Sequence, residues 1–453
     1  MGGPLTSEAA LLNHLLSCAL LALLVSAPAS MQAASPPSGE FRAGPGERVT
    51  ISGARGRVLS RERGVEPGDG FGQAVAGDPI PGGFNALMYG APGGDDGAGR
   101  VWAAFLEGGE RNFYFSVDGA ALEGGAVRGF GQSLITLGHI DPLSHWAAGA
   151  PGDGDPAGPP SAVVILHAPN QDRLVERWRL ESDPEARLGW QITLLDHDPE
   201  DSIVDHFAVS APGQPRGRRQ AAGAIYGISS VDGEVAWMLL GNAARFHLGY
   251  AMDWVSDWDG DGVRDLLVGA PHPKKGRVLL VSAASGQVLW TLRSPAGARL
   301  FGLSVHEADL DGDGTRDVLV GAPGTNGTAG AETGAVYAFA GTDRRPLFSR
   351  QGEEPGQKMG VSVSTVGDRD GDGLREVLVA SLYENPQRPE RGSRGAVEVF
   401  GSASGELLVR SRGRRPGDRL GWGILRGLPD IDGDGVDDYF TFSPRGGAIY
   451  LPQ

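Results

Sequence analysis

The chain has 453 residues, of which 40% are hydrophobic, with 73 glycines, 31 prolines and a formal net charge of −16. This much glycine and proline predicts frequent turns and excludes long helices, and the acidic charge argues against nucleic acid as a partner. Cys18 is the only cysteine, so an internal disulfide is excluded.

The chain begins with a segment that contains an apolar run, Leu15–Ala27, followed by small residues. This pattern predicts a signal peptide over residues 1–29 and a protein that is secreted, or held at the cell surface or in the periplasm. The run is too short for a membrane span, so we expect none in the mature chain. Glu8 and His14 stand where basic residues are usual, which leaves an uncleaved anchor as the alternative. Residues 30–55, rich in Ser, Pro, Ala and Gly, are expected to be a linker.

From residue 56 onward the sequence repeats a unit seven times. A large apolar residue followed by glycine marks each unit, at intervals of 53 to 61 residues. These dipeptides are Phe71-Gly72, Phe130-Gly131, Leu188-Gly189, Leu248-Gly249, Phe301-Gly302, Met359-Gly360 and Leu420-Gly421. Four short apolar strands follow in a unit, the second commonly ends in Gly-Ala-Pro, and turn pairs such as Asp232-Gly233 join the third to the fourth.

Four antiparallel strands in each of seven units predict an all-β fold, a seven-bladed β-propeller over residues 56–453. The last unit stops after its third strand, Ala448–Leu451, and lacks a fourth. The segment Gly56–Arg61 precedes the first unit and matches the fourth strand of the others. We therefore expect this N-terminal strand to complete the last blade and close the ring.

Four units carry the same acidic loop, Asp-x-Asp-Gly-Asp-Gly-x-x-Asp or its Glu variant, between their first and second strands. Carboxylates at loop positions 1, 3, 5 and 9 repel one another, and the usual reason to concentrate them is a hard divalent cation. A backbone carbonyl at position 7 can join them, and Ca²⁺ is favoured over Mg²⁺ because many flexible oxygen ligands suit the larger ion. The predicted metal ligands are Asp257, Asp259, Asp261, Val263, Asp265, Asp309, Asp311, Asp313, Thr315, Asp317, Asp368, Asp370, Asp372, Leu374, Glu376, Asp430, Asp432, Asp434, Val436 and Asp438.

An EF-hand is the alternative for this spacing, but it needs a glutamate at position 12 and flanking helices. Position 12 is valine or threonine here, and a β-run follows every loop, so we expect about four Ca²⁺ ions in hairpin bends. Residues 78–83 and 139–143 replace the loop in the first two units and cannot cage an ion. The third unit has a degenerate loop, Asp196–Asp205, whose calcium binding the sequence leaves open.

These units resemble FG-GAP repeat proteins, the family that includes the propeller heads of integrin alpha subunits. The resemblance covers about residues 56–453 and implies a seven-bladed propeller with calcium in the hairpin loops of the later blades. It also implies that ligands bind the face away from calcium. It is less specific for function, because one fold serves many partners.

In an antiparallel four-stranded blade the acidic loops share one end, and the loops between strands two and three lie at the other. The latter loops are rich in basic residues, namely Arg216, Arg218, Arg219, Lys274, Lys275, Arg388, Arg391 and Arg394. We expect this face to bind an extracellular protein or an acidic polysaccharide. The alternative is that these side chains are only solvated and keep the protein soluble. Trp258, inside an acidic loop, is expected to pack against the next blade.

The predicted function is that of a secreted calcium-binding propeller, acting as a binding or adhesion module for a surface protein or polysaccharide. The alternative is a calcium-dependent carbohydrate-active enzyme, a lyase or hydrolase, with its site in the propeller funnel. The sequence contains no Gly-x-Ser-x-Gly, His-Glu-x-x-His or phosphate-loop motif, and no histidine stands with a carboxylate in a motif that interrupts the repeat. We therefore predict no catalytic residues.

Overall fold

The computed structural model describes residues 41–43, 47–49, 74–79, 84–93, 97–107, 110–122, 125–139, 144–167, 174–195, 206–384, 392–423, 425–427, 436–441 and 448–450. These residues form an all-β structure with two short 3-10 turns, η3 (Gly119–Ala121) and η4 (Pro184–Ala186). No helix among them has the length and apolar character needed to cross a membrane. The predicted signal peptide lies outside the described residues.

Six four-stranded antiparallel sheets follow one another along the chain, with the strands of each sheet paired in chain order. Their strands are β3 (Ala74–Pro79), β4 (Phe84–Ala91), β5 (Arg100–Glu107), β6 (Glu110–Asp118); β7 (Leu134–His139), β8 (Ser144–Ala150), β9 (Ser161–His167), β10 (Val175–Ser182); β11 (Ile192–Leu194), β12 (His206–Ala211), β13 (Ala224–Ser229), β14 (Val235–Leu240); β15 (Ala251–Trp254), β16 (Leu266–Ala270), β17 (Arg277–Val281), β18 (Val288–Arg293); β19 (Ser304–Ala308), β20 (Asp317–Gly321), β21 (Ala335–Phe339), β22 (Pro346–Gln351); β23 (Ser362–Val366), β24 (Glu376–Ser381), β25 (Ala396–Phe400) and β26 (Leu407–Arg412). The predicted all-β fold of four-stranded antiparallel sheets is confirmed in these residues.

Two smaller sheets complete the described chain. A three-stranded sheet follows the sixth four-stranded one, with β27 (Leu425–Gly427), β28 (Tyr439–Thr441) and β29 (Ala448–Tyr450). Near the other end, β1 (Phe41–Ala43) and β2 (Glu47–Val49) pair as a two-stranded sheet within the segment predicted to be a linker. The segment Gly56–Arg61, predicted to close the ring, lies outside the described residues.

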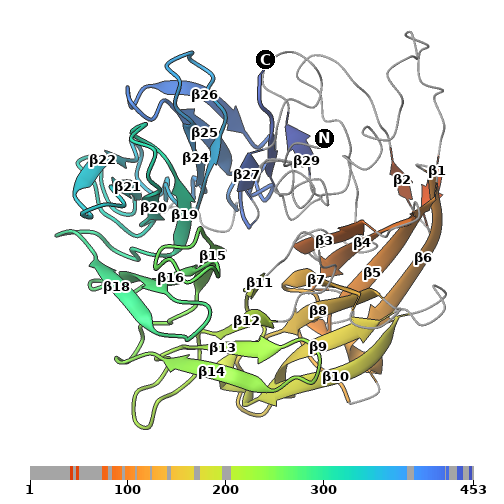
Figure 1. Ribbon diagram of the computed structural model, residues 1–453. Coiled ribbons are helices and arrows are strands. Elements are labelled where there is room, and N and C mark those ends of the chain that lie inside the picture. Colours follow the sequence, from red (N-terminus) through yellow and green to blue (C-terminus); the bar gives the residue numbers. More distant parts are fainter. Residues whose placement is uncertain are drawn as a thin grey trace, which may run out of the picture.

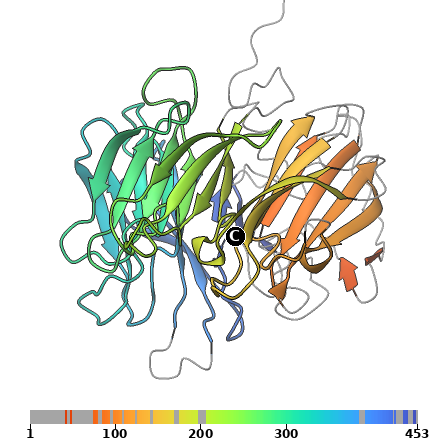
Figure 2. The same cartoon turned by 90° about the horizontal axis from the view of Figure 1, so that it is seen from below.

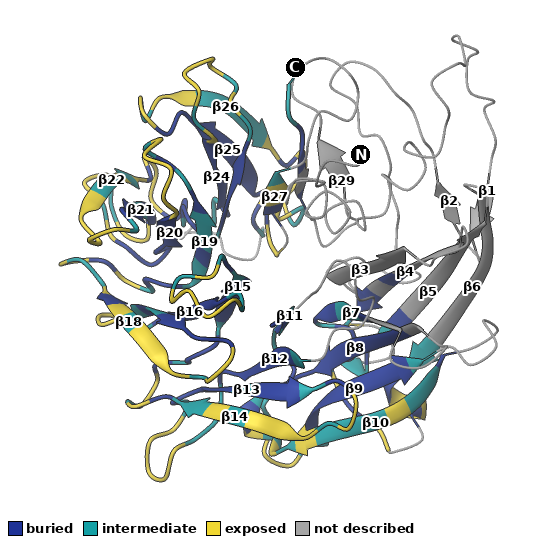
Figure 3. Cartoon of the chain, viewed as in Figure 1, coloured by how far each residue is buried: buried dark blue, intermediate teal, exposed yellow. Residues whose placement is uncertain are grey.

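The sheets are arranged around a common centre, with the first strand of each sheet innermost (Figure 1). Successive first strands contact one another, from β3 and β7 through to β23 and β27. The fourth strands form the outer wall. Figure 3 shows exposed residues along these strands, while the middle strands are mostly buried. This radial arrangement is that of β-propeller blades.

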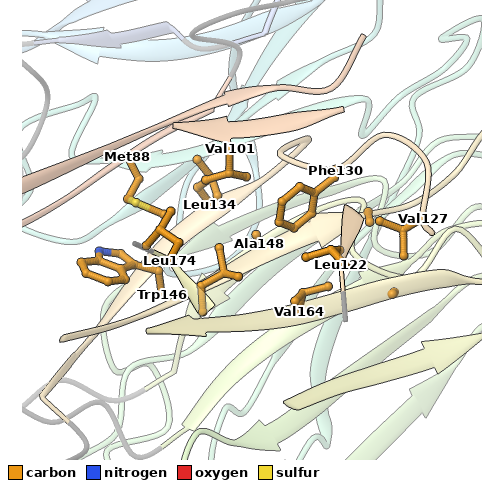
Figure 4. Close-up of a cluster of buried hydrophobic side chains, with 13 residues drawn as sticks. Met88, Val101, Leu122, Val127, Phe130, Leu134, Trp146, Ala148, Val164 and Leu174 are labelled. Carbon is orange, nitrogen blue, oxygen red and sulfur yellow. The ribbon is translucent and has the colours of Figure 1, made fainter. Parts of the chain in front are cut away.

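Alternate residues of each middle strand face the two neighbouring sheets, which explains the apolar runs in the sequence. On β20, Val318 and Val320 pack toward the preceding sheet and Leu319 toward the following one. The same interleaving joins the first two four-stranded sheets, where Met88 and Val101 belong to one cluster with Trp146 (Figure 4). Each fully buried side chain of this size contributes about 1.5–3 kcal/mol, so apolar contacts hold neighbouring sheets together.

The two motifs of the repeat meet at one contact between neighbouring sheets. Gly302, the glycine of its dipeptide, has a φ of +87° and donates its N–H to the carbonyl of Gly321 at 3.1 Å. A Cβ added to Gly321 would lie 2.1 Å from the carbonyl oxygen of Gly360, which is the dipeptide glycine of the next unit. The Gly-Ala-Pro glycine of one unit therefore abuts the dipeptide glycine of the next. Two units that depart from the motif have the small residues Ser210 and Ala380 at this position, and the seventh has Phe442.

The first two units replace the acidic loop partly by continuing their hairpins. Asp78 and Pro79, predicted to lie in a loop, belong to β3 and pair with Ala86 and Asn85 on β4. His139 likewise ends β7, where it pairs with Ser144. The remaining residues of these two loops, and the degenerate loop 196–205, lie outside the described residues.

Candidate functional site

Three acidic loops are described completely, and all three connect the first and second strands of their sheets, as predicted. They share one hydrogen-bond pattern, in which the carboxylate at position 1 accepts two backbone N–H groups. Asp257 accepts Gly260 N–H at 2.7 Å and Gly262 N–H at 2.9 Å. Asp309 and Asp368 make the equivalent pairs of bonds in the other two loops. The glycines have positive φ, so the loop folds tightly around its first carboxylate.

The loops bring together the carboxylates of positions 1, 3 and 9. In each loop one oxygen from each of these three groups lies within 4.8 Å of the others. The groups are Asp257, Asp259 and Asp265; Asp309, Asp311 and Asp317; and Asp368, Asp370 and Glu376. The carboxylates of position 5, on Asp261, Asp313 and Asp372, are not in these groups. Each of them accepts the backbone N–H of position 7 at 2.8 Å.

The carboxylate of position 9 forms the buried floor of each cluster. Asp317 and Glu376 are the first residues of β20 and β24, so these two predicted loop ligands lie in strands. Asp265 is fully buried, and its Oδ2 accepts Trp258 N–H at 2.8 Å while its Oδ1 has no hydrogen-bond partner. Burial raises the pKa of Asp265 to about 6, and the carboxylates of Asp259 and Asp257 also raise it. Burial likewise raises the pKa of Asp317 and of Glu376.

The donor set of these clusters fits a hard cation. Each cluster offers only carboxylate oxygens, which are the ligands that Ca²⁺ prefers. The unpartnered Oδ1 of Asp265 is the kind of buried oxygen that an ion would satisfy, since a buried acceptor without a partner is costly. Of the predicted ligands in the fourth loop, only Val436 and Asp438 are described, and Asp438 is fully buried like its counterparts. Asp430, Asp432 and Asp434 lie outside the described residues.

A glutamate on the neighbouring sheet accepts hydrogen bonds from the first acidic loop and from the residue before it. Glu307, on β19, accepts the backbone N–H of Ser256 at 3.0 Å and the indole N–H of Trp258 at 2.6 Å. Trp258 also contacts Trp290 edge-to-face, with ring centroids 5.7 Å apart. The predicted packing of Trp258 against the next blade is therefore confirmed. No local sequence pattern marks Glu307, because only the contact between sheets reveals its role.

The basic residues singled out in the sequence lie in the loops between second and third strands, at the opposite end from the acidic loops. Figure 2 shows the loops at the two ends of the sheets. The basic residues that the structure describes are all exposed, namely Arg216, Arg218, Arg219, Lys274, Lys275 and Arg394. Arg216 also reaches the carbonyl oxygens of Leu240 and Gly241, each at 3.4 Å. Arg388 and Arg391 lie outside the described residues.

A hollow of about 350 Å³ opens at the same end, over the first three sheets. Its lining includes Arg128, Gln132, Asp153 and Trp190. Arg128 and Asp153 form an ion pair, and the backbone N–H of Asp155 together with Arg128 lowers the pKa of Asp153. The end of the ring with the basic loops thus also has a polar hollow with an aromatic wall.

A polar cluster on the innermost strands brings a histidine together with a carboxylate. His306 Nδ1 on β19 lies 2.8 Å from Asp253 Oδ2 on β15, and His306 Nε2 lies 3.3 Å from Thr365 Oγ1 on β23. Arg426 on β27 donates to Asp253 Oδ1 at 3.4 Å. Burial alone would raise the pKa of Asp253, but Arg426 and His306 hold it below its usual value. No local motif marks these residues, since they come from four different units.

Comparison with known proteins adds a family and a set of relatives. Residues 257–320, which include the first two acidic loops, match the model of the FG-GAP-like repeat. Integrin alpha-4 of Xenopus laevis is 28% identical over 255 residues, which cover 52% of this chain and 23% of that protein. Integrin alpha-IIb of Homo sapiens is 33% identical over 221 residues, covering 44% and 20%. Integrin alpha-V of Gallus gallus is 29% identical over 209 residues, covering 42% and 19%.

The chain thus matches about a quarter or less of the length of each of these relatives. The matched repeat coincides with the part of the structure in which acidic loops join the first and second strands of consecutive sheets. Sequence period, sheet architecture and similarity therefore agree: the chain contains an FG-GAP-like repeat and is similar to integrin alpha subunits.

Proposed function

We propose that this protein is a secreted, calcium-stabilised, seven-bladed propeller that acts as a binding or adhesion module for an extracellular protein. The observation that carries the proposal is the set of three carboxylate clusters at equivalent loop positions, all at one end of an integrin alpha-like array of sheets. Such clusters stabilise a scaffold, which leaves the other end free for a partner.

The ring of seven blades is part of the proposal. Six four-stranded sheets and a seventh of three strands support it. We propose that Gly56–Arg61 supplies the fourth strand of the last blade, because this segment directly precedes the first unit. A chain shortened to begin at residue 66 would then lose stability, measured as a lower melting temperature, whereas one shortened to begin at residue 50 would not.

The metal sites are proposed to hold Ca²⁺ through positions 1, 3 and 9, with positions 5 and 7 completing the shell. When bound, the ion supplies positive charge that offsets the repulsion among the carboxylates. The residues of the fourth loop, Asp430, Asp432, Asp434, Val436 and Asp438, are proposed to form a fourth site because they repeat the same spacing.

The partner is proposed to bind the end that carries the basic loops. Exposed Arg218 and Arg219, Lys274 and Lys275, and the hollow beside Trp190 provide positive charge and an aromatic surface there. Electrostatic complementarity would favour an acidic surface. At the acidic-loop end, bound Ca²⁺ would neutralise much of the charge that a partner could recognise.

Binding to a surface extract of the producing cell tests this proposal. The Arg218→Glu/Arg219→Glu variant should lose most of its retention on the immobilised extract. Arg344→Glu/Arg375→Glu, which changes the net charge equally at exposed positions at the acidic-loop end, should retain it. Protease treatment of the extract should abolish binding if the partner is a protein. Loss of binding only after removal of acidic polysaccharide would identify the polymer instead, and equal retention of both variants would contradict the proposed face.

A second candidate is a carbohydrate-active enzyme that uses the cluster on the innermost strands. A hydroxyl, an imidazole and a carboxylate in hydrogen-bond sequence, Thr365, His306 and Asp253, are groups that can transfer protons. A screen of polysaccharides for lyase or hydrolase products tests this candidate. Turnover that disappears in His306→Gln, in a variant with unchanged melting temperature, would favour the enzyme over the binding module.

A further inference from the structure

The outer wall of the ring contains one unusual edge strand. An outermost strand exposes unpaired backbone N–H and C=O groups, and proteins usually protect such an edge with charged residues or proline. Among the six described four-stranded sheets, β6, β10, β18, β22 and β26 all follow this rule. Only β14, with the sequence Val-Ala-Trp-Met-Leu-Leu, has neither a charge nor a proline.

The exposed side chains of β14 are apolar as well. Met238 is 51% exposed and Val235 is 43% exposed, and Figure 3 shows the strand as an exposed band on the outer wall. Trp237 is turned inward, where its indole N–H donates to the carbonyl of Ala283 at 2.8 Å. The strand is thus firmly held by the next sheet while its outer edge remains available for pairing.

The two ends of β14 carry opposite charges. Asp232 and Glu234 are exposed in the turn that precedes the strand. Arg216 lies at the other end, where it contacts the carbonyl oxygens of Leu240 and Gly241, and exposed Arg218 and Arg219 are nearby in the sequence. An antiparallel copy of the same strand would place its acidic end beside the basic end of the first, and the reverse.

We propose that two copies of this chain associate through β14, paired antiparallel about a two-fold axis. An isologous contact of this kind is self-complementary, so both acidic-to-basic contacts form at once. A register centred on Met238 places Met238 opposite its own counterpart and Leu240 opposite Ala236 of the partner copy, so apolar side chains cover each other. The pairing joins two four-stranded sheets into one continuous sheet of eight strands. Both copies keep their basic loops at the rim of the contact.

A cysteine at the two-fold axis tests the geometry directly. In the full chain with Cys18→Ser, Met238→Cys should form a disulfide-linked dimer under mild oxidation. Val288→Cys, at a similarly exposed position on β18, should remain monomeric under the same conditions. Equal cross-linking of the two variants would overturn the proposal.

The strength and polarity of the contact have a second test. In analytical ultracentrifugation the wild-type chain should dimerise with rising concentration, and Met238→Lys should raise the dissociation constant at least tenfold, while Val288→Lys should not. Arg216→Glu and Glu234→Arg should each weaken the dimer, and the double variant should regain most of the affinity. A wild-type chain that stays monomeric at all concentrations, or a dimer unaffected by Met238→Lys, would refute the pairing. Circular dichroism melting verifies that each variant is folded.

Discussion

At the scale of single residues, Asp265 connects the fold of a loop to its proposed ion. Its Oδ2 accepts a backbone N–H that shapes the loop, and its buried Oδ1 has no partner. Asp265→Asn keeps an oxygen for that N–H and removes a buried charge. We therefore expect the free energy of unfolding of the calcium-free protein to change by less than about 1 kcal/mol, because neighbouring carboxylates repel the one that is removed.

The calcium-bound form of the same variant should behave differently. We expect Asp265→Asn to lose most of the stability that the ion adds at this loop, because a neutral amide replaces an anionic ligand. Urea unfolding with and without added Ca²⁺ measures the difference. Asp232→Asn, in an exposed turn at the same end of the sheets, is the control. If added Ca²⁺ raised the free energy of unfolding equally in both variants, the proposed role of Asp265 would be contradicted.

The stability that Asp253 contributes should depend on pH. Its carboxylate is buried, and Arg426 and His306 hold its pKa below the usual value. A depressed pKa stabilises the folded state above the unfolded pKa of about 3.9, and this stabilisation is lost as the pH falls through the folded pKa. Asp253→Asn should therefore cost roughly 3 kcal/mol at pH 7 and progressively less in acid. The unfolding free energies of the two proteins should differ by a constant amount down to about pH 4 and converge between about pH 4 and pH 2. A difference that persists unchanged to about pH 2 would exclude the ionised pair.

At the scale of elements, the dipeptide glycines determine how closely neighbouring sheets pack. Gly302 and Gly297 both have positive φ, but only Gly302 is crowded, since its Cβ would lie 2.6 Å from the carbonyl oxygen of Arg277. Gly297→Ala should cost about 1 kcal/mol from backbone strain alone. Gly302→Ala should cost about 3 kcal/mol because the sheets must also move apart. Thermal unfolding compares them, and equal losses would show that the contact between sheets is not tight.

The same elements show what the sequence could predict. Strand order, the position of the acidic loops and the packing of Trp258 follow from a period that repeats within about 60 residues, so local patterns locate them. Glu307 and the pairing of His306 with Asp253 do not follow, because each joins residues about 50 positions apart on different sheets. Asp317 and Glu376, which the sequence places at the ends of loops, are the first residues of strands. Their buried carboxylates nevertheless accept N–H groups of the loops.

At the scale of the whole molecule, the acidic loops link the proposed ions to the packing of successive sheets. Each described cluster is built on the first and second strands of its sheet, and the first strands meet around the centre. Repulsion at these loops would loosen the hairpins nearest the centre. Ions bound there would therefore stabilise the contacts between sheets as well as the loops themselves, and their removal should affect the unfolding of the entire ring.

Calcium removal is the corresponding prediction. An ion present at a hundredfold excess over its dissociation constant stabilises the folded state by about 2.7 kcal/mol per site. A chelator should therefore lower the melting temperature, and added Ca²⁺ should restore it. Replacing Asp257, Asp309 and Asp368 by alanine, one after another, should reduce in steps the fall in melting temperature that the chelator causes. Because the loops belong to different sheets, unfolding should remain a single transition that moves as a whole. A melting temperature indifferent to chelator would show that the carboxylate clusters hold no structural calcium.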